Sequence, residues 1–236
     1  MPIRVRRISI IIPMRDEAAL IVKALRAVEK WRHLGHEIIV VDGDSTDCSC
    51  ALAAPLCDRL VHAKPSRAGQ MNAGAAAASG ELLLFLHADT ILPDNAVEQL
   101  ATVNLRDFDY WGRFDVRLDA QPAIYRVIER LMNWRSRLTG IATGDQAIFV
   151  SRSLFKRSGG FPNIVLMEDI ALSAILRRLQ APKILGTPVL SSARRWQRHG
   201  VARTILTMWS LRAAFYFGAS PDRLRAFYQR RTHSLE

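Results

Sequence analysis

The sequence predicts an α/β fold in which a mostly parallel central sheet is flanked by helices. Residues 8–12 and 82–86 are unbroken apolar runs of strand length, which suits strands buried on both faces of a parallel sheet. Strand and helix patterns alternate through the first 106 residues, as in a doubly wound sheet. Polar residues follow several of the predicted strands, and open α/β sheets bind their ligands at that edge.

The first half of the chain is predicted to contain four parallel strands joined by helices. The first two strands and the helix between them form a βαβ unit, whose crossover is expected to be right-handed. In order, the predicted elements are strands over 8–12, 37–41, 59–62 and 82–86, a helix over 17–33 that Gly35 ends, an Ala-rich helix that ends at Gly80, and a helix over 93–105.

The second half departs from this pattern. Residues 110–118 alternate between apolar and charged side chains, which predicts a half-exposed strand antiparallel to the core. A helix over 122–138 is expected to stop at Gly140. The remaining predicted elements are strands over 147–150 and 183–185 and helices over 170–179, 201–217 and 221–231.

Charge and cysteine content limit the classes of function. A net charge of +11 favours anionic partners such as nucleotide phosphates, nucleic acid or an anionic membrane. The three cysteines, Cys48, Cys50 and Cys57, have no His or Cys partners at zinc spacing and fit a reducing cytosol. We find no signal peptide and no apolar run of 18 residues, so we expect a cytoplasmic protein without a transmembrane helix.

The C-terminal segment combines arginines with aromatic residues in an amphipathic pattern. Such a pattern is typical of an element that lies on a membrane surface. A pair of helices packed on the core has the same pattern. Both interpretations stay open, so peripheral contact with the cytoplasmic face of a membrane is one of two expectations for this segment.

Acidic residues follow two of the predicted parallel strands. Asp89 comes after the apolar run 82–86, and a carboxylate buried there needs a cation or hydrogen bonds to compensate it. We therefore expect Asp89 to bind a divalent metal that carries a diphosphate; the alternative is a cap for the helix near Pro93. Asp42 ends the second strand, where it can accept hydrogen bonds from a base or a ribose hydroxyl. Thr46 or Asp47 is expected to cap the next helix.

Three further groups of polar residues have two interpretations each. Arg67 and Asn72 lie in a segment that either contacts phosphate or is a solvated loop before a tightly packed helix. Glu168 and Asp169 begin a helix, where carboxylates complement the helix dipole or supply a general base. The third group is an anion clamp or a basic surface loop, and it consists of Arg194, Arg195 and Trp196.

Five segments, taken in order, resemble the family 2 glycosyltransferases, which have the GT-A fold. They span residues 9–170 and read SIIIPMRDE, VVDGDSTD, RAGQMNAG, HADT and MEDI. A sixth segment, SSARRW, is similar to the short single-domain members with an Arg-Arg-Trp near the C-terminal end. The resemblance implies a GT-A domain over residues 1–200, with a nucleotide-binding half over 1–106 and an acceptor half over 107–200. Residues 201–234 would be amphipathic C-terminal helices.

The resemblance also implies a donor and a set of site residues. The donor would be a nucleotide-diphospho-sugar, usually UDP- or GDP-linked, with Asp89 binding Mn²⁺ or Mg²⁺ across the diphosphate. Asp169 would be the general base beside Glu168. Many members have Asp at the position of His87, so the ribose contact of that position is in doubt. The expected substrate-binding residues are Pro13, Glu17, Asp42, Asp44, Arg67, Asn72, His87, Asp145, Gln146, Arg194, Arg195 and Trp196.

The expected activity is metal-dependent, inverting transfer of a sugar to a hydroxyl acceptor, with a lipid as one candidate. No Gln stands three residues before the Arg-Trp pair, so processive polymerisation is not expected. One alternative is a catalytically silent nucleotide-sugar-binding protein. Another is a sugar-phosphate nucleotidyltransferase, which would have a Gly-rich basic loop where this chain has PMRDE. Nucleic acid is not an expected partner, because the acidic strand ends would repel its phosphates. The oligomeric state is not readable from the sequence.

Overall fold

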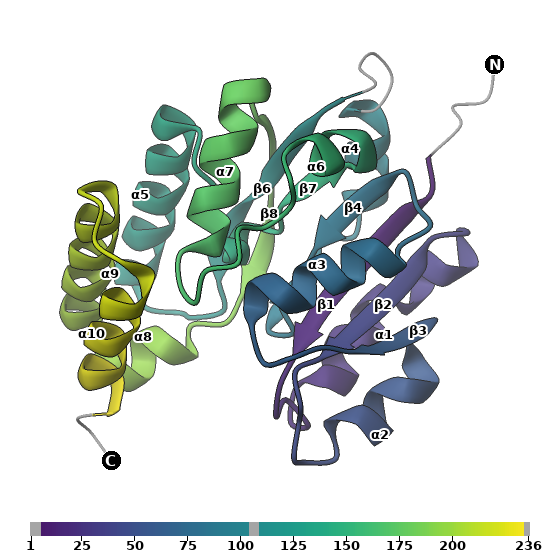
Figure 1. Ribbon diagram of the computed structural model, residues 1–236, viewed down its shortest axis with the longest axis horizontal. Coiled ribbons are helices and arrows are strands. Elements are labelled where there is room, and N and C mark those ends of the chain that lie inside the picture. The colour runs from purple at the N-terminus through teal and green to yellow at the C-terminus, as the bar shows by residue number, and fades with distance from the viewer. Residues whose placement is uncertain (1–5, 104–108, 234–236) are drawn as a thin grey trace.

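The computed structural model describes residues 6–103 and 109–233, and its mixed α/β architecture confirms the predicted fold class (Figure 1). Within these residues, eight strands form one sheet in the order β3-β2-β1-β4-β7-β6-β8-β5. The strands are β1 (Ile8–Met14), β2 (Glu37–Asp42), β3 (Arg59–His62), β4 (Leu82–Phe85), β5 (Thr90–Ile91), β6 (Trp111–Leu118), β7 (Phe149–Ser151) and β8 (Lys183–Ser191).

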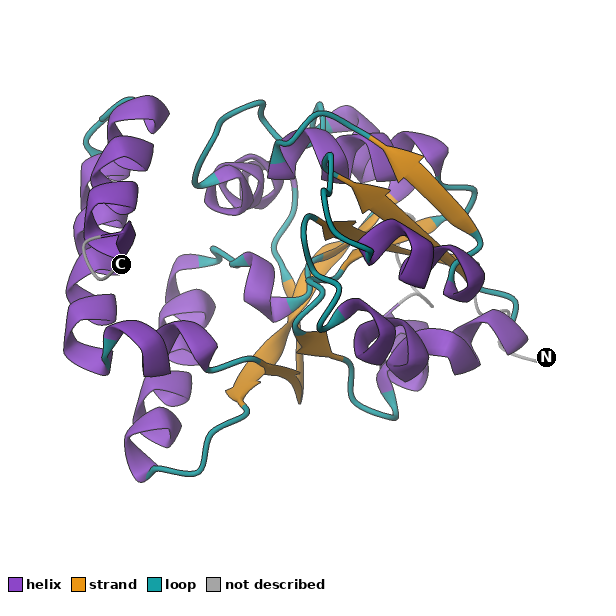
Figure 2. Cartoon of the chain, turned by 90° about the horizontal axis from the view of Figure 1, so that it is seen from below, coloured by secondary structure: helices purple, strands orange, loops and turns teal. Residues whose placement is uncertain are grey.

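Helices surround this sheet (Figure 2). The α-helices are α1 (Ile21–His33), α2 (Ser49–Ala53), α3 (Arg67–Ala77), α4 (Ala96–Val103), α5 (Ala123–Thr139), α6 (Arg152–Arg157), α7 (Glu168–Leu179), α8 (Arg194–His199), α9 (Val201–Tyr216) and α10 (Pro221–His233). Two short 3₁₀ turns, η1 (Ala54–Leu56) and η2 (Gly144–Gln146), complete the description.

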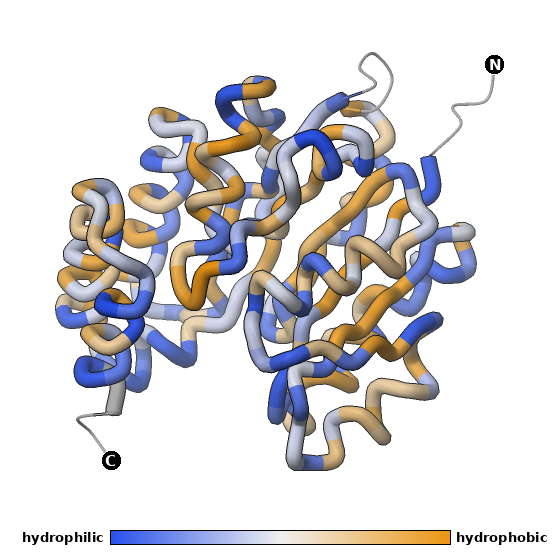
Figure 3. Tube along the Cα trace, viewed as in Figure 1, coloured by the Kyte–Doolittle hydropathy of each residue, from blue (hydrophilic) through white to orange (hydrophobic). Residues whose placement is uncertain are grey.

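The four predicted parallel strands are confirmed. β1 pairs in parallel with β2 on one side and β4 on the other, and β2 pairs in parallel with β3. Every residue of β1, β2 and β4 is buried, and Figure 3 shows the apolar character of these strands. Helix α3 packs closely on the sheet because Gly74 has no side chain: a β-carbon there would lie 2.4 Å from Ile11 Cγ2. Adjacent parallel strands end at one edge, so the residues after β1, β2 and β4 are neighbours.

The expectation of a half-exposed antiparallel strand over residues 110–118 is wrong on both points. Only Arg117 in β6 is exposed, and β6 has the direction of β4 because the antiparallel β7 lies between them. The charged residues of the alternation are buried as a pair: Arg113 donates to Asp115, which also pairs with Arg137 of α5. The alternation of apolar and charged residues therefore does not indicate a solvent-exposed face here, because Arg113 and Asp115 pair with each other inside the protein.

Other boundaries differ for local reasons. Helix α1 begins at Ile21 rather than residue 17, because Asp16 has a left-handed backbone (φ 51°) and a turn follows it. Strand β8 extends six residues beyond the predicted 183–185 because it pairs with β6 as far as Ser191. Neither Thr46 nor Asp47 is the N-cap of α2, which is Cys48, although Asp47 accepts a hydrogen bond from the Ser49 amide. Residues 104–105 of the helix predicted over 93–105 lie outside the described residues.

Residues 201–233 form two helices that lie side by side at one edge of the molecule (Figures 1 and 2). Leu211 of α9 and Leu224 of α10 are buried in one cluster with Met167, so the pair is packed on the rest of the chain. Trp209, Tyr216 and Phe217 nevertheless stay largely exposed. Among the described helices, none combines the length and apolar character that a membrane span needs.

Candidate active site

Several of the predicted site residues gather at the edge where β1, β2 and β4 end. Glu17 follows β1, and Asp89 follows β4. Arg194, the first residue of α8, lies between them, with its Nη2 3.8 Å from Asp89 Oδ2 and 4.0 Å from Glu17 Oε2. Burial raises the pKa of Glu17, and the Arg194 charge opposes that shift. This edge therefore concentrates negative charge that a guanidinium partly compensates.

Asp89 does not cap a helix. Helix α4 begins only at Ala96, well beyond the loop that holds Asp89. The Asp89 side chain is 32% exposed, and its backbone carbonyl accepts a hydrogen bond from the Ser192 amide, which fixes the loop against the end of β8. A partly exposed carboxylate with a remaining coordination side is the kind of ligand that Mg²⁺ and Mn²⁺ use with substrate phosphates.

His87 faces the same edge as a neutral imidazole. Its Nε2 lies 3.4 Å from Arg67 Nη1, and a β-carbon at Gly144 would lie 2.4 Å from its Cε1. Burial, followed by the charges of Arg67 and Arg195, lowers the pKa of His87 well below its ordinary value. A neutral imidazole has a free lone pair for a metal or a hydroxyl. His87 and Asp89, which both follow β4, thus supply a nitrogen and an oxygen donor at one edge of the sheet.

The carboxylates at the start of α7 reach the same region. Glu168 and Asp169 line one pocket with His87, and the apolar walls come from residues such as Met71 and Phe161. The Gly144 amide donates to Asp169 Oδ2 at 2.8 Å, which ties α7 to the loop beneath His87. Burial, and then the Asp169 charge, raises the pKa of Glu168 to about 7. A carboxyl group near neutrality beside a second carboxylate suits proton transfer.

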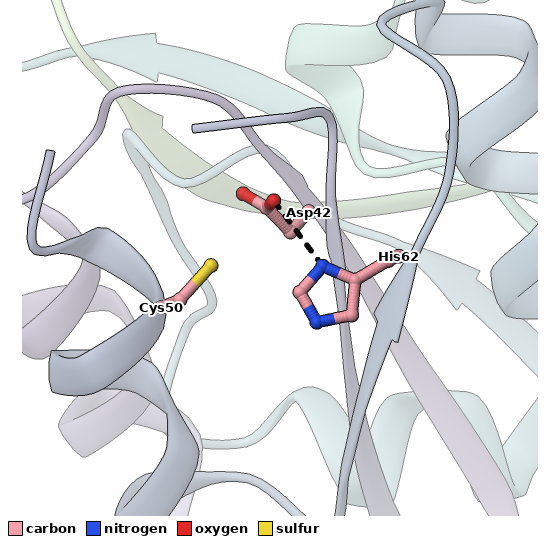
Figure 4. A group of neighbouring side chains, drawn as sticks. All are labelled: Asp42, Cys50 and His62. Carbon is pink, nitrogen blue, oxygen red and sulfur yellow. Dashed lines mark ion pairs between the residues drawn. The ribbon is translucent and has the colours of Figure 1, made fainter. Parts of the chain in front are cut away.

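Asp42 has a separate, hydrogen-bonded surrounding (Figure 4). The Ser45 amide donates to it at 3.2 Å, and His62 Nδ1 lies 3.5 Å from its Oδ2. Burial opposes ionisation, but the contacts with Ser45, Cys50 and His62 hold the pKa of Asp42 below its usual value. The ligand atoms of Asp42, Cys50 and His62 lie within 4.8 Å of one another. Burial raises the pKa of the Cys50 thiol to about 11, so this group is better described as hydrogen-bonded than as a metal centre.

Several predicted residues support the site from outside it. Pro13 is buried in β1 beside Val41. Asn72 brackets the backbone of Phe161: its Nδ2 donates to the carbonyl at 2.8 Å, and its Oδ1 accepts from the amide at 2.9 Å. Gln146 is buried, and its Oε1 accepts from the Thr143 amide. These contacts hold the loops that line the pocket.

The structure does not bring every predicted residue into the pocket. Trp196 is buried against Tyr125 and Ile128, so its ring packs α8 onto α5 instead of flanking the arginines. Asp44 is exposed with a left-handed backbone (φ 59°). Asp145 accepts a hydrogen bond from the Thr143 hydroxyl next to Gly144. Arg195 is exposed at the start of α8, within electrostatic range of His87.

Sequence reasoning did not single out three residues that shape the site. The Gln70 amide donates to the Met14 and Val41 carbonyls at 2.8 and 2.9 Å, which joins the ends of β1 and β2. Arg135 of α5 and Arg212 of α9 lie within electrostatic range of Asp145 and Asp169. The only available signal for Arg212 was an arginine inside a strongly apolar segment, which also fits a surface helix.

Comparison with known proteins agrees with this arrangement. A family model of glycosyl transferase family 2 matches residues 9–158, more than half of the chain. The chain therefore belongs to glycosyl transferase family 2. A Sodalis glossinidius protein named undecaprenyl-phosphate 4-deoxy-4-formamido-L-arabinose transferase is 24% identical over 225 residues, which are 89% of this chain and 68% of that protein. An uncharacterized glycosyltransferase of Nostoc sp. is 31% identical over 104 residues, and the match covers 41% of this chain but only 32% of that relative.

Solved structures confirm the GT-A fold. The crystal structure of S. aureus TarS 1–349 superposes with a TM-score of 0.65 at 16% identity, covering 84% of this chain and 64% of that one. The mannosyltransferase PcManGT from Pyrobaculum calidifontis, in complex with GDP-Man and Mn²⁺, has a TM-score of 0.64 at 22% identity. That match covers 97% of this chain and 69% of the mannosyltransferase.

The raised pKa of Glu168 predicts that the free energy of unfolding of the protein depends on pH. Its folded pKa of about 7 exceeds the ordinary glutamate value of 4.5, so between these pH values the native state retains a proton that the unfolded chain has lost. The stabilisation is complete below the unfolded pKa and is lost as the pH rises through 7. Glu168→Gln stays neutral, so we expect its free energy of unfolding relative to the wild type to rise by on the order of 2 kcal/mol from pH 5 to pH 8.

Urea denaturation at four pH values measures this difference. The control is Glu98→Gln, an exposed glutamate in the first turn of α4, whose difference from the wild type should not vary with pH. A Glu168→Gln difference that is equally flat would contradict a proton held by Glu168 near neutrality.

Proposed function

We propose that this chain is a metal-dependent, inverting glycosyltransferase that moves a sugar from a nucleotide-diphospho-sugar to a hydroxyl acceptor. The observation that carries this proposal is the meeting of His87 with Glu168 and Asp169 in one pocket, beside the edge that holds Asp89. This arrangement supports a cation site and a basic group close to one bound donor. Membership of glycosyl transferase family 2 supports the same class of reaction.

The donor would lie across the ends of β1, β2 and β4. Asp42 is ionised and already accepts a backbone amide, so it can also accept a hydrogen bond from a base N–H. Arg194 and Arg67 can contact the diphosphate, since guanidinium groups match phosphate oxygens. Complexes of similar folds with UDP-GlcNAc and GDP-Man support a donor of this class.

The residues for a cation are Asp89 and His87. A bound Mn²⁺ or Mg²⁺ would neutralise the charge that develops on the departing diphosphate. The partial exposure of Asp89 and the neutral state of His87 support this role. Neighbours of the same fold with Mn²⁺ or with Mg²⁺ and UDP support divalent metal use.

Asp169 is our candidate general base. In the transfer, the bond from the anomeric carbon to the diphosphate oxygen breaks and its electron pair leaves with the nucleotide. The acceptor oxygen forms the new bond, and its proton passes to the carboxylate of Asp169. Because one base acts and no covalent sugar intermediate is needed, the anomeric configuration is inverted. Glu168, buried beside it, would act as the neighbour that sets its charge.

We also propose peripheral contact with an anionic membrane through α5 and α9. Helix α5 exposes an apolar stripe at spacings of three and four residues: Ile124, Val127, Leu131, Trp134 and Leu138. Helix α9 exposes Leu206 and Trp209, and arginines are frequent in both helices. The name of the Sodalis glossinidius relative includes a lipid-linked phosphate, which supports a membrane-located acceptor.

Two alternative functions predict different observations. A silent nucleotide-sugar-binding protein would bind the donor but release no nucleotide. A sugar-phosphate nucleotidyltransferase needs a basic loop after the first strand, whereas the backbone after β1 is fixed by contacts of Asp16 and Glu17 with Ser45 and Ser49. We therefore favour sugar transfer.

Replacing the metal ligand should remove metal-dependent nucleotide binding. With Asp89→Asn, we expect the Mn²⁺-dependent thermal shift from UDP or GDP to disappear and the affinity for the nucleotide in Mn²⁺ to fall at least about ten-fold. Affinity in EDTA should change little. The matched control is Asp94→Asn, an exposed residue paired with Lys30. If Asp89→Asn keeps the full Mn²⁺-dependent shift, Asp89 is not the ligand.

Replacing the base should stop turnover without removing the donor. For Asp169→Asn, we expect kcat for nucleotide release to fall by about 10²- to 10⁴-fold while donor affinity in Mn²⁺ stays within a few-fold. Asp222→Asn on α10 is an exposed control. Proton NMR of fresh product should show the anomeric configuration opposite to that of the donor. Retained configuration, or equal turnover by the variant, would contradict the mechanism.

Removing exposed tryptophans should weaken membrane binding. We expect the protein to co-sediment with vesicles of mixed phosphatidylcholine and phosphatidylglycerol, and Trp134→Ser or Trp209→Ser to reduce partitioning by roughly ten-fold because each exposes less apolar surface to the bilayer. Leu34→Ser is the control, since Leu34 is 60% exposed after α1, in the nucleotide-binding half. If all three variants lose vesicle binding to the same extent, the result would argue against a membrane-binding surface formed by α5 and α9.

A further inference from the structure

Three arginines from different helices lie within electrostatic range of residues that line the pocket. Arg135 comes from α5, Arg195 from α8 and Arg212 from α9. Arg212 interacts electrostatically with both Arg135 and Arg195. It also interacts with the charges of Asp145 and Asp169. The three guanidinium groups therefore form one cluster, in which Arg195 interacts with His87, and Arg135 and Arg212 interact with the candidate base Asp169.

The cluster is short of partners. Arg135 Nε and Nη2 are buried without a hydrogen-bond partner, and its Nη1 reaches the Ile141 carbonyl only at 3.5 Å. Within residues 6–103 and 109–233, no carboxylate lies within 4.0 Å of the Arg135 or Arg212 guanidinium. Burying a cation without a paired anion is costly, because its hydration is lost without replacement. Such a cost is kept where a ligand supplies the missing anion.

Packing fixes the position of these side chains. Leu211 is 1% exposed and lies in one cluster with Met167, the residue before Glu168. Its neighbour Arg212 is thereby held beside the start of α7. Burial, more than any neighbouring charge, lowers the pKa of Arg135 to about 10 and also lowers that of Arg212. Both remain cationic at neutral pH.

We propose that Arg135 and Arg212, with Arg195, bind an anionic, phosphate-like group of the acceptor. The proposal rests on the proposed transferase function, since it places this group next to Asp169. Guanidinium groups bind phosphate oxygens with paired hydrogen bonds, which a neutral alcohol cannot supply. The donor diphosphate is not the partner, because Arg194 and Arg67 already stand on the donor side with Asp89 and His87.

Two sources have this chemistry: a lipid monophosphate and a water-soluble phosphorylated alcohol. A C15 prenyl monophosphate and glycerol 3-phosphate serve as probes, with the prenol and glycerol as their uncharged counterparts. We expect one of the two phosphates to stabilise the wild type in a thermal-shift assay, at concentrations where its uncharged counterpart has no effect. A shift by the prenyl probe alone identifies a lipid acceptor, and one by glycerol 3-phosphate alone a soluble acceptor.

Variants then assign that shift to the cluster. Arg135→Gln and Arg212→Gln should each lower affinity for the effective phosphate at least about ten-fold. Arg212→Lys keeps the charge but not the paired geometry, so it should fall between Gln and the wild type, and it serves if the Gln variant is unstable. Arg178→Gln, an exposed arginine on α7, should bind as the wild type does.

Mn²⁺-dependent UDP or GDP binding is measured on the same samples and separates the two hypotheses. If nucleotide binding is intact but no phosphate probe binds better than its uncharged counterpart, the acceptor inference is wrong and the transferase function is untouched. If the phosphate binds equally to wild type and both Gln variants, the cluster only balances the charges of Asp145 and Asp169, and the inference is again wrong. If the wild type itself does not bind UDP or GDP in Mn²⁺, the proposed function is contradicted instead.

Discussion

The compensation of negative charge at one edge of the sheet is the constraint on which the rest of the site depends. Parallel pairing of β1 with β2 and β4 brings their ends together, so Glu17 and Asp89 become neighbours. Arg194 lies between them and partly balances their charges. A metal diphosphate would carry its own positive ion to Asp89 and its own phosphates to Arg194. Binding of a metal diphosphate would therefore replace the ion pairs of Arg194 with Asp89 and Glu17 by ion pairs with the ligand, and no charge would be left unpaired.

The segment after β4 and the start of α7 are joined by a short chain of contacts through Gly144. His87 occupies the space that a side chain at this position would fill, and the Gly144 amide holds Asp169. A β-carbon at Gly144 would displace the imidazole and shift the loop, so both sides of the pocket need this residue to be glycine. Two further contacts stabilise the same region. They are the buried Arg113–Asp115 ion pair in β6 and the hydrogen bond that Gln146 Oε1 accepts from the Thr143 amide. The position of the candidate base thus depends on the second half of the sheet.

Local patterns predicted much of this arrangement, and long-range packing explains what they missed. The apolar runs over residues 8–12 and 82–86 predicted the buried strands β1 and β4, and the parallel pairing of these strands brings the carboxylates that follow them to one edge. The alternation in β6 failed as a guide because its charged residues pair with each other and with α5 rather than with water. Trp196 beside two arginines suggested an anion clamp, yet α5 supplies an apolar surface that buries the ring. Which face of a helix is covered depends on elements far away in the chain.

The two carboxylates at the start of α7 illustrate how neighbouring residues acquire different roles. Glu168 is buried, and a carboxyl group with a pKa of about 7 holds a proton for part of the time at neutral pH. Asp169 instead accepts hydrogen bonds from the Gly144 and Ile170 amides and lies within range of Arg135 and Arg212. A proton on Glu168 removes the repulsion between the two carboxyl groups. Those same arginines would draw an anionic acceptor toward the Asp169 carboxylate and offset the repulsion between them, which explains how a base and an anion-binding cluster can share one pocket.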